Sequence, residues 1–196
     1  MSVTPDFIAK ARALAFYRKF KTRRARRAGK IYCDNESPFG WEKLGSGAFG
    51  EAWGHEDHFG YVVKISGRSE FGTNRLADEK PSLDGWPTFA QHCQANPHPN
   101  LPKIMHFERL SLGVSFGIMP WYETIDRIRD ADIVDEWYDY LEGGGGAPEW
   151  LWPIIGMRGA LGMMVDLHSR NVMRDPVTGE YIMTDPFSFA GITTWA

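Results

Sequence analysis

The segment from Val165 to Met173 reads VDLHSRNVM, and the later segment from Thr184 to Phe187 reads TDPF. They supply one carboxylate, Asp166, a carboxamide, Asn171, and a second carboxylate, Asp185. A carboxylate can orient or deprotonate an attacking hydroxyl, while a carboxamide and a second carboxylate can hold the divalent cation that bridges nucleotide phosphates. This trio of side chains therefore indicates phosphoryl transfer.

The residues between these two segments indicate a hairpin. Val172-Met173 and Tyr181-Ile182-Met183 are short apolar runs, and the intervening Asp175 to Gly179 contains the Asp, Pro and Gly that are typical of a turn. We expect Asp166 and Asn171 at the two ends of a tight loop, with Asp185 following the second strand of the hairpin. The alternative interpretation is an ordinary polar loop that contains one Asp.

A glycine-rich segment lies earlier in the chain. Residues 44–53 read LGSGAFGEAW, in which Gly45, Gly47 and Gly50 have the spacing Gly-x-Gly-x-x-Gly. Lys64 follows within YVVKI, an apolar run typical of a strand. A charged side chain in such a strand is costly unless it is paired. The lysine therefore points to a functional role.

Four features occur here in the order found in the protein-kinase-like superfamily, which the chain resembles. They are the glycine-rich segment from Gly45 to Gly50, which we call the glycine turn, the strand lysine Lys64, Asp-x4-Asn and a second Asp. The resemblance implies an α+β fold, a minimal protein-kinase-like fold with a small antiparallel N-lobe sheet and a truncated helical C-lobe that carries the catalytic loop and a hairpin. It also implies ATP and Mg²⁺ as cofactors, with the glycines close to the phosphates and Lys64 on the α and β phosphates.

The resemblance assigns roles residue by residue. The expected catalytic residues are Asp166, Lys64 and His168, and the expected magnesium ligands are Asn171 and Asp185. The expected nucleotide contacts are Leu44, Gly45, Ser46, Gly47, Gly50, Val62, Lys64, Met119, Trp121 and Met173.

The expected segments follow the same order. We predict a basic N-terminal helix in 1–33, a kinase N-lobe in 34–119, and a hinge with a truncated C-lobe in 120–196. Strands are expected at 103–107 and 112–119, and helical patterns at 125–141 and 150–164. Gly156, Gly159 and Gly162 recur every three residues, which predicts a line of close packing beneath the catalytic loop.

The partner of Lys64 stays open. In kinases a helix, here expected between residues 75 and 94, carries a glutamate that pairs with the lysine. Glu79 is followed by Pro81, which breaks a helix, and Asp84 is the other candidate. Counting back from His98-Pro99-Asn100-Leu101 places Phe89 at the expected position of the glutamate.

The N-terminus is predicted to be helical over about residues 5 to 27, because Thr4-Pro5-Asp6 provides a capping hydroxyl, a first-turn proline and a first-turn carboxylate. Arg18 to Lys30 holds eight Lys or Arg and no acidic residue. This run is either a solvated basic face or a docking surface for nucleic acid or an acidic partner.

Composition indicates a globular protein. The chain has 196 residues, 43% of them hydrophobic, and a formal net charge of -3. Cys33 and Cys93 are isolated, which is typical of free thiols in a reducing compartment. We find no signal-like start and no long apolar run, and we therefore expect a cytoplasmic protein without membrane contact.

A narrower resemblance rests on Asp166-Leu167-His168-Ser169, Asn171, Met173 and Thr184-Asp185-Pro186. Across roughly residues 40 to 190 the chain is similar to the early host-takeover Ser/Thr protein kinases of short-tailed, autographivirus-type bacteriophages. That resemblance implies phosphorylation of host proteins, including RNA polymerase or RNA-processing enzymes, in the host bacterial cytoplasm. Two alternatives remain: a pseudokinase-like effector that binds and inhibits a host protein, and a small-molecule phosphotransferase of the aminoglycoside type.

Overall fold

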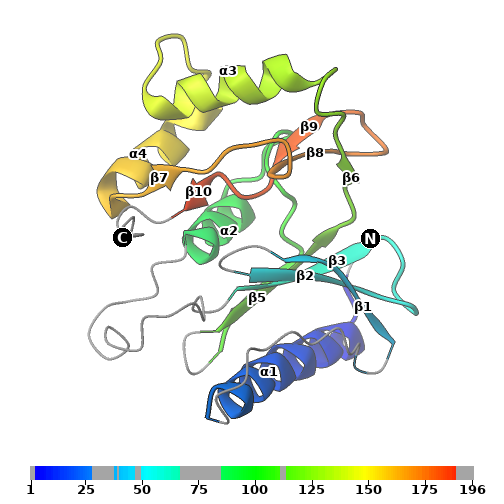
Figure 1. The fold of residues 1–196 in the computed structure, drawn as a ribbon. Coiled ribbons are helices and arrows are strands. Elements are labelled where there is room, and N and C mark those ends of the chain that lie inside the picture. Colours follow the sequence, from blue (N-terminus) through cyan, green and yellow to red (C-terminus); the bar gives the residue numbers. More distant parts are fainter. Residues whose placement is uncertain are drawn as a thin grey trace. The chain divides into compact units, whose positions relative to one another are not determined.

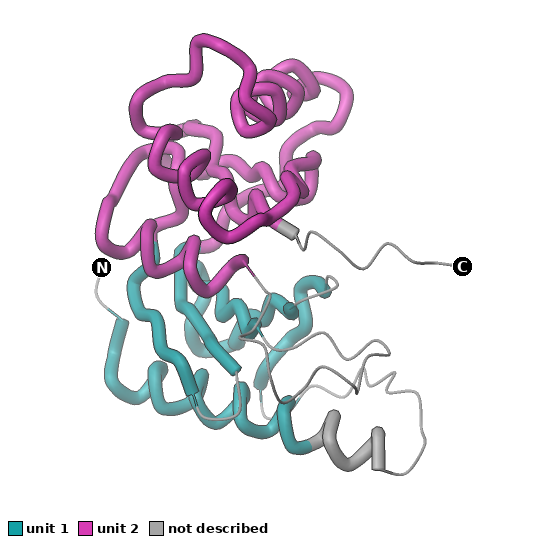
Figure 2. Tube along the Cα trace, turned by 90° about the vertical axis from the view of Figure 1, so that its left-hand side faces the viewer, with its two compact units in different colours: residues 1–83, 104–120 teal, residues 84–103, 121–196 magenta. Residues whose placement is uncertain are grey.

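A computed structural model describes residues 3–27, 38, 40–46, 50–66, 85–110 and 114–188. The chain divides into two compact units, coloured separately in Figure 2. The first comprises residues 1–83 and 104–120, and the second comprises residues 84–103 and 121–196. The chain thus enters the second unit for one helix, returns to the first for two strands, and leaves it again after Pro120. The expected mixed α+β content is confirmed.

The first unit contains a five-stranded antiparallel sheet with the strand order β1-β2-β3-β5-β4 (Figure 1). Its strands are β1 (Trp41–Ser46), β2 (Gly50–His55), β3 (Tyr61–Ser66), β4 (His106–Arg109) and β5 (Ser115–Pro120). The expected lysine strand is confirmed, and the strand expected at 112–119 is found as β5, which begins at Ser115; residues 112 and 113 lie outside the described part of the chain. The strand expected at 103–107 lies instead at β4, because its register is set by pairing with β5: His106 lies opposite Ile118, and Arg109 opposite Ser115.

The N-terminal helix α1 (Pro5–Arg27) confirms the predicted helix. One face of α1 lies against the sheet and shares its hydrophobic core (Figure 1). The buried members of this core are Phe7, Ala11, Leu14, Ala15, Trp41, Trp53, Val63, Ile65, Val114, Phe116 and Ile118. Burying a large apolar side chain stabilises a fold by about 1.5–3 kcal/mol, so α1 contributes directly to the stability of this unit.

The structure corrects one prediction about the basic run. Arg18 was expected to begin an exposed basic surface, but only 6% of it is exposed. It follows Leu14 and Ala15 by one helical turn and therefore lies on the same face of α1, against the sheet. There its guanidinium pairs with Glu51. The side chains of residues 21–30 lie outside the described part of the chain.

The second unit combines three helices of the described chain with short strands. The helices are α2 (Trp86–Ala95), α3 (Ala131–Glu142) and α4 (Trp152–Leu161), the last preceded by the 3₁₀ turn η2 (Glu149–Leu151). The strands are β6 (Glu123–Thr124), β7 (Met164–Val165), β8 (Val172–Arg174), β9 (Tyr181–Met183) and β10 (Phe187–Ser188). They form a three-stranded sheet, β6-β8-β9, and a two-stranded sheet, β10-β7.

The helical pattern at 125–141 begins later in the structure than in the prediction. The Asp126 carboxylate accepts the main-chain N–H groups of Ile128 and Arg129 at 2.9 and 3.0 Å, so these residues form a turn. Side-chain bonds of this kind compete with helical bonds. Helix α3 therefore begins at Ala131.

The predicted line of close packing along α4 is wrong. Gly156 and Gly159 are exposed, and a Cβ added at either would meet no described atom within 4 Å. Gly162 has another function, because its φ of +62° places it in the left-handed conformation that ends the helix. Of these three glycines, only Gly162 has a conformational reason to be glycine.

Two further observations concern the predictions about membrane contact and free thiols. None of the described helices is both long and apolar enough to span a membrane. Cys93 is a buried free thiol on α2, and burial raises its pKa above the ordinary range. Cys33 lies outside the described residues.

Candidate active site

The predicted site residues fall into two groups, one in each unit. In the second unit, β7 and β10 pair so that Val165 lies opposite Phe187. The main-chain N–H of Asp166 then donates a hydrogen bond of 2.9 Å to the carbonyl oxygen of Pro186. This places Asp166 beside the segment that contains Asp185.

Asn171 closes the loop that Asp166 begins. Its side-chain nitrogen donates to the Asp166 carbonyl oxygen at 2.7 Å, and its main-chain N–H donates to the His168 carbonyl oxygen at 2.8 Å. The Asn171 carbonyl oxygen accepts both the main-chain N–H and the hydroxyl of Thr184, at 2.8 and 3.0 Å. The loop carrying Asp166 and Asn171 is therefore hydrogen-bonded at both ends to the segment on either side of Asp185.

The donor set suits a magnesium ion. The amide nitrogen of Asn171 is used by the Asp166 carbonyl, so its Oδ1 atom is the part of the carboxamide that can accept a cation. Mg²⁺ is usually held by one or two carboxylates together with waters and substrate phosphates. The described residues include no group of three or more His, Cys, Asp or Glu that could hold a metal by themselves. Asp185 and Asn171 thus match a cation that arrives with phosphate, and that role stays a prediction.

His168 is exposed and shapes the same loop. Its Nδ1 atom accepts the main-chain N–H of Arg170 at 3.1 Å, which assigns the proton of a neutral imidazole to Nε2. In this tautomer Nε2 carries the proton, so the Asn171 side-chain nitrogen 3.3 Å away is a neighbour and not a hydrogen-bond acceptor. The bond from Arg170 explains a histidine here by loop geometry, and its expected catalytic role stays a prediction.

The hairpin after the loop is confirmed. Val172 lies opposite Met183, and Arg174 lies opposite Tyr181. Both Val172 and Met183 are fully buried. Met173 lies between Ile182 and Thr124 and is partly exposed, and its predicted contact with a nucleotide stays a prediction.

Asn100 is a site-supporting residue that the sequence interpretation missed. Its carbonyl oxygen accepts the Met183 N–H at 3.0 Å, and its side-chain amide donates to the Tyr181 carbonyl oxygen at 3.0 Å. It therefore binds the outer edge of β9, the strand that leads to Asp185. Asn100 lies in the segment from His98 to Leu101, which the sequence analysis used only to locate the helix before it. That segment was the part of the sequence that could have indicated a supporting role for Asn100.

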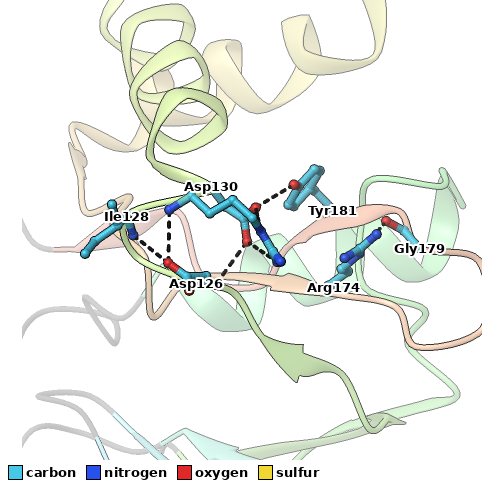
Figure 3. A network of polar contacts seen from close by, with 7 residues as sticks. Asp126, Ile128, Asp130, Arg174, Gly179 and Tyr181 are labelled. Carbon is cyan, nitrogen blue, oxygen red and sulfur yellow. Dashed lines mark hydrogen bonds and ion pairs between the residues drawn. The ribbon is translucent and has the colours of Figure 1, made fainter.

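A second missed contact joins the hairpin to the turn before α3 (Figure 3). The Tyr181 hydroxyl donates to Asp130 at 3.0 Å, and the Asp126 N–H donates to the same carboxylate at 3.0 Å. The Arg129 guanidinium, also bonded to it, is the main cause that lowers the pKa of Asp130 from 3.8 to about 2. This buried carboxylate holds the Tyr181 side chain of β9, in addition to the contacts that β9 makes with β8 and Asn100. Asp130 has no role in the predicted chemistry.

Four of the residues predicted for the nucleotide lie on one face of the five-stranded sheet, which we call the lysine face: Leu44, Val62, Lys64 and Met119. Side chains alternate along a strand, and Val63, Ile65 and Ile118 point into the core with α1. The opposite face therefore carries Val62 and Lys64 from β3 and Met119 from β5, with Val62 directly opposite Met119.

Small residues flank Lys64 on the lysine face. Its cross-strand neighbours are Ala52 on β2 and Gly117 on β5. Leu44 belongs to the same face, because its side chain lies 3.5 Å from the position of a Cβ added at Gly54. The expected apolar contacts Leu44, Val62 and Met119 thus share a sheet face with Lys64, whose cross-strand neighbours Ala52 and Gly117 are small.

The ends of the glycine turn are described, although Gly47 is not. Gly45 and Ser46 are exposed at the end of β1, and Gly50 begins β2. A Cβ at Gly50 would lie 2.7 Å from the carbonyl oxygen of Ile65. Gly50 is therefore required by the close approach of β3.

Two other predictions concern the hinge residue Trp121 and the carboxylate partner of Lys64. Trp121 is 44% exposed directly after β5, at the predicted hinge. Helix α2 carries no acidic residue, and its Phe89 is buried against Phe187 with ring centroids 6.3 Å apart. Glu79 and Asp84, the two candidate partners of Lys64, lie outside the described residues.

Comparison with known proteins adds no assignment: no protein-family model matches the chain, and no curated protein matches it either.

Proposed function

We propose that the protein is an ATP-dependent phosphotransferase of protein-kinase-like architecture. The observation that carries the proposal is the hydrogen-bonded frame around Asp166, Asn171 and Asp185. Three residues chosen from the sequence for one chemistry come from two separate segments, and main-chain bonds to Pro186 and Thr184 join those segments.

Each group of residues has a distinct task. Asp166 orients the acceptor hydroxyl and receives its proton, while Asn171 and Asp185 would hold Mg²⁺ through oxygen atoms. When bound, that ion would supply neutralisation of charge on the phosphates. Lys64 binds phosphate oxygens, and Leu44, Val62 and Met119 provide apolar contacts for the base. Positioning and charge neutralisation supply most of the catalysis in this type of reaction.

We propose protein Ser/Thr hydroxyls as the acceptors, on the strength of the resemblance to the phage host-takeover kinases. The targets would be host bacterial proteins such as RNA polymerase or RNA-processing enzymes, in the host cytoplasm. Lys and Arg residues beyond Arg18 provide charge for an acidic protein or nucleic acid, because residues 19–30 contain seven cations and no acid.

A second candidate stays open. Helix α2 has no acidic residue, and Glu79 and Asp84, the carboxylates predicted for the kinase-type ion pair, lie outside the described residues. A pseudokinase-like effector that binds ATP and inhibits a host protein is therefore the alternative.

Radiolabel transfer from γ-labelled ATP into bacterial lysate separates these functions. We expect labelled protein bands that contain phosphoserine or phosphothreonine. Label found only in small molecules would indicate an aminoglycoside-type phosphotransferase. Nucleotide binding without transfer would indicate the effector, and absence of both binding and transfer would contradict the proposed function.

A further inference from the structure

Glu51 is held by α1 at the point where β2 leaves the glycine turn. The Arg18 guanidinium binds its carboxylate with two nitrogens, at 2.8 Å from Nε and 2.6 Å from Nη2. The Arg18 side chain is only 7% exposed, and that of Glu51 is 23% exposed. A two-nitrogen arginine contact of this kind fixes orientation as well as distance.

Two further groups hold the same carboxylate. The Lys43 ammonium lies 3.0 Å from Oε1, and the Trp53 indole N–H donates to Oε2 at 3.3 Å. The Arg18 guanidinium also lies over the Trp53 ring, 4.9 Å from its centroid, an arrangement that attracts a cation. We call Arg18, Lys43, Glu51 and Trp53 the Glu51 clamp.

The Glu51 clamp spans both stems of the glycine turn. Lys43 lies on β1 before the turn, and Glu51 lies on β2 after it. Ser46 and Glu51 are directly opposite each other at the base of the turn, and the register shifts between Lys43 and Gly45. A bulged strand pair bends locally, so the contact between Lys43 and Glu51 fixes the stems where their pairing is irregular.

The clamp is also close to the lysine face. Ala52, the residue after Glu51, lies directly opposite Lys64. Gly50, the residue before it, approaches the Ile65 carbonyl so closely that no side chain fits. A displacement of Glu51 would therefore move the exit of the glycine turn relative to the lysine strand.

The electrostatics agree with a strongly held carboxylate. Burial acts to raise the pKa of Glu51, but hydrogen bonds from Arg18 and Lys43 outweigh it, and the pKa is lowered. Removing one partner of such a pair leaves a poorly solvated charge, which is costly.

We propose that Glu51 is a positioning residue for nucleotide binding, and that α1, through Arg18, sets the geometry of the glycine turn and so the affinity for a nucleoside triphosphate. This inference rests on the proposed function. It gives α1 a role in the nucleotide site in addition to its contribution to the core.

The chain offers a matched control. Arg12 of α1 binds Glu108 of β4 with two nitrogens, at 2.9 and 2.8 Å to its two oxygens. This ion pair also joins α1 to the sheet, but β4 is the edge strand farthest from β1 in the strand order. Glu108→Gln therefore removes the same kind of contact at the opposite edge.

The test compares the full-length wild type with Glu51→Gln, Arg18→Gln, Glu108→Gln and the charge-exchanged double variant Arg18→Glu/Glu51→Arg. KM for ATP and kcat are measured together with hydrogen exchange of the amides of residues 50–53. We expect Glu51→Gln and Arg18→Gln to raise KM for ATP about tenfold with a smaller change in kcat, as for an interaction made in ground and transition states alike. Exchange at residues 50–53 should accelerate, and the double variant should recover part of both losses.

Glu108→Gln should leave KM for ATP and exchange at residues 50–53 within about twofold of wild type. An unchanged KM for ATP in an active Glu51→Gln protein, or an equal rise in Glu108→Gln, would overturn the positioning role and leave the proposed function intact. A folded wild type that neither binds nor uses ATP would overturn both, whatever the exchange rates. If Glu51→Gln does not fold, Arg18→Gln and the double variant decide the question by the same readouts.

Discussion

The main-chain N–H of Asp166 lies 2.9 Å from the carbonyl oxygen of Pro186, to which it donates a hydrogen bond. Pro186 directly follows Asp185, so this one contact joins the predicted base to the predicted metal-binding segment. Asn171 strengthens the junction through its bond to the Asp166 carbonyl at 2.7 Å. The backbone geometry of the loop thus depends on a side chain that is also expected to bind a cation.

The two tasks of Asn171 can be separated by substitution. Asn171→Asp keeps an oxygen for a cation but loses the N–H donor, and it places a carboxylate oxygen against the Asp166 carbonyl. We expect kcat to fall at least about tenfold, because misplacement of a catalytic group is costly, while activity still depends on Mg²⁺. Steady-state kinetics across a magnesium titration measures both effects. Wild-type kcat in Asn171→Asp would show that the bond to Asp166 has no catalytic importance.

Asn100 is expected to stabilise β9. Asn100→Ala removes the donor to the Tyr181 carbonyl and should lower the free energy of unfolding by about 1–2 kcal/mol, the usual cost of an unsatisfied, partly buried acceptor. Urea unfolding measures the loss. Asn96→Ala, which removes an exposed amide bonded to the His92 carbonyl, is the control and should cost less. Equal losses in the two variants would contradict a special role for Asn100.

Asp130 predicts a specific pH dependence. Its pKa is lowered from 3.8 in the unfolded chain to about 2 in the fold, chiefly by the Arg129 hydrogen bond and further by the Tyr181 hydroxyl. The unfolded state therefore binds the proton first, and the stability that the carboxylate contributes is complete above pH 3.8 and lost as the pH falls toward 2. The difference in unfolding free energy between wild type and Asp130→Asn should be constant near neutrality and shrink in that window. A difference that does not vary with pH would refute the linkage, and Asp135→Asn on the exposed face of α3 is the control.

The glycines of α4 predict opposite effects at neighbouring positions. Gly156→Ala and Gly159→Ala should each stabilise the protein by up to about 1 kcal/mol, because alanine favours a helix and no described atom crowds the new Cβ. Gly162→Ala should destabilise it, because its φ of +62° is unfavourable for alanine. Chemical denaturation of the three variants is sufficient. Destabilisation by Gly156→Ala would mean that α4 is closely packed in solution.

Local patterns predicted much of the fold. Pro5 to Arg27 formed the expected helix, because a first-turn proline and apolar residues one turn apart determine a helix without long-range information. The hairpin after Asn171 followed from its Asp-Pro-Val-Thr-Gly turn, in which the Asp175 side chain accepts the Val177 and Thr178 N–H groups at 2.8 and 3.2 Å. The lysine strand followed from its apolar composition.

Contacts between distant segments could not be read from local patterns. Arg18 looked like part of a basic surface, because nothing near it in the sequence reveals that Glu51 lies opposite. Asn100 and Tyr181 are separated by 81 positions in the chain, and a single sequence carries no signal for such a pair. The regular spacing of the α4 glycines suggested packing, but which face of a helix is covered depends on the tertiary fold, and Gly156 and Gly159 are exposed.

The most direct test of the account is the rate of γ-phosphate transfer by Asp166→Ala, measured with labelled ATP and bacterial lysate beside wild type and Asp135→Ala. If Asp166 receives the proton of the acceptor, its loss should lower the rate by about 10²–10⁴, the range for removal of a general base, while ATP binding persists. Asp135→Ala, which removes an exposed carboxylate from the same unit, should transfer phosphate at the wild-type rate. Transfer by Asp166→Ala at the wild-type rate would contradict the account.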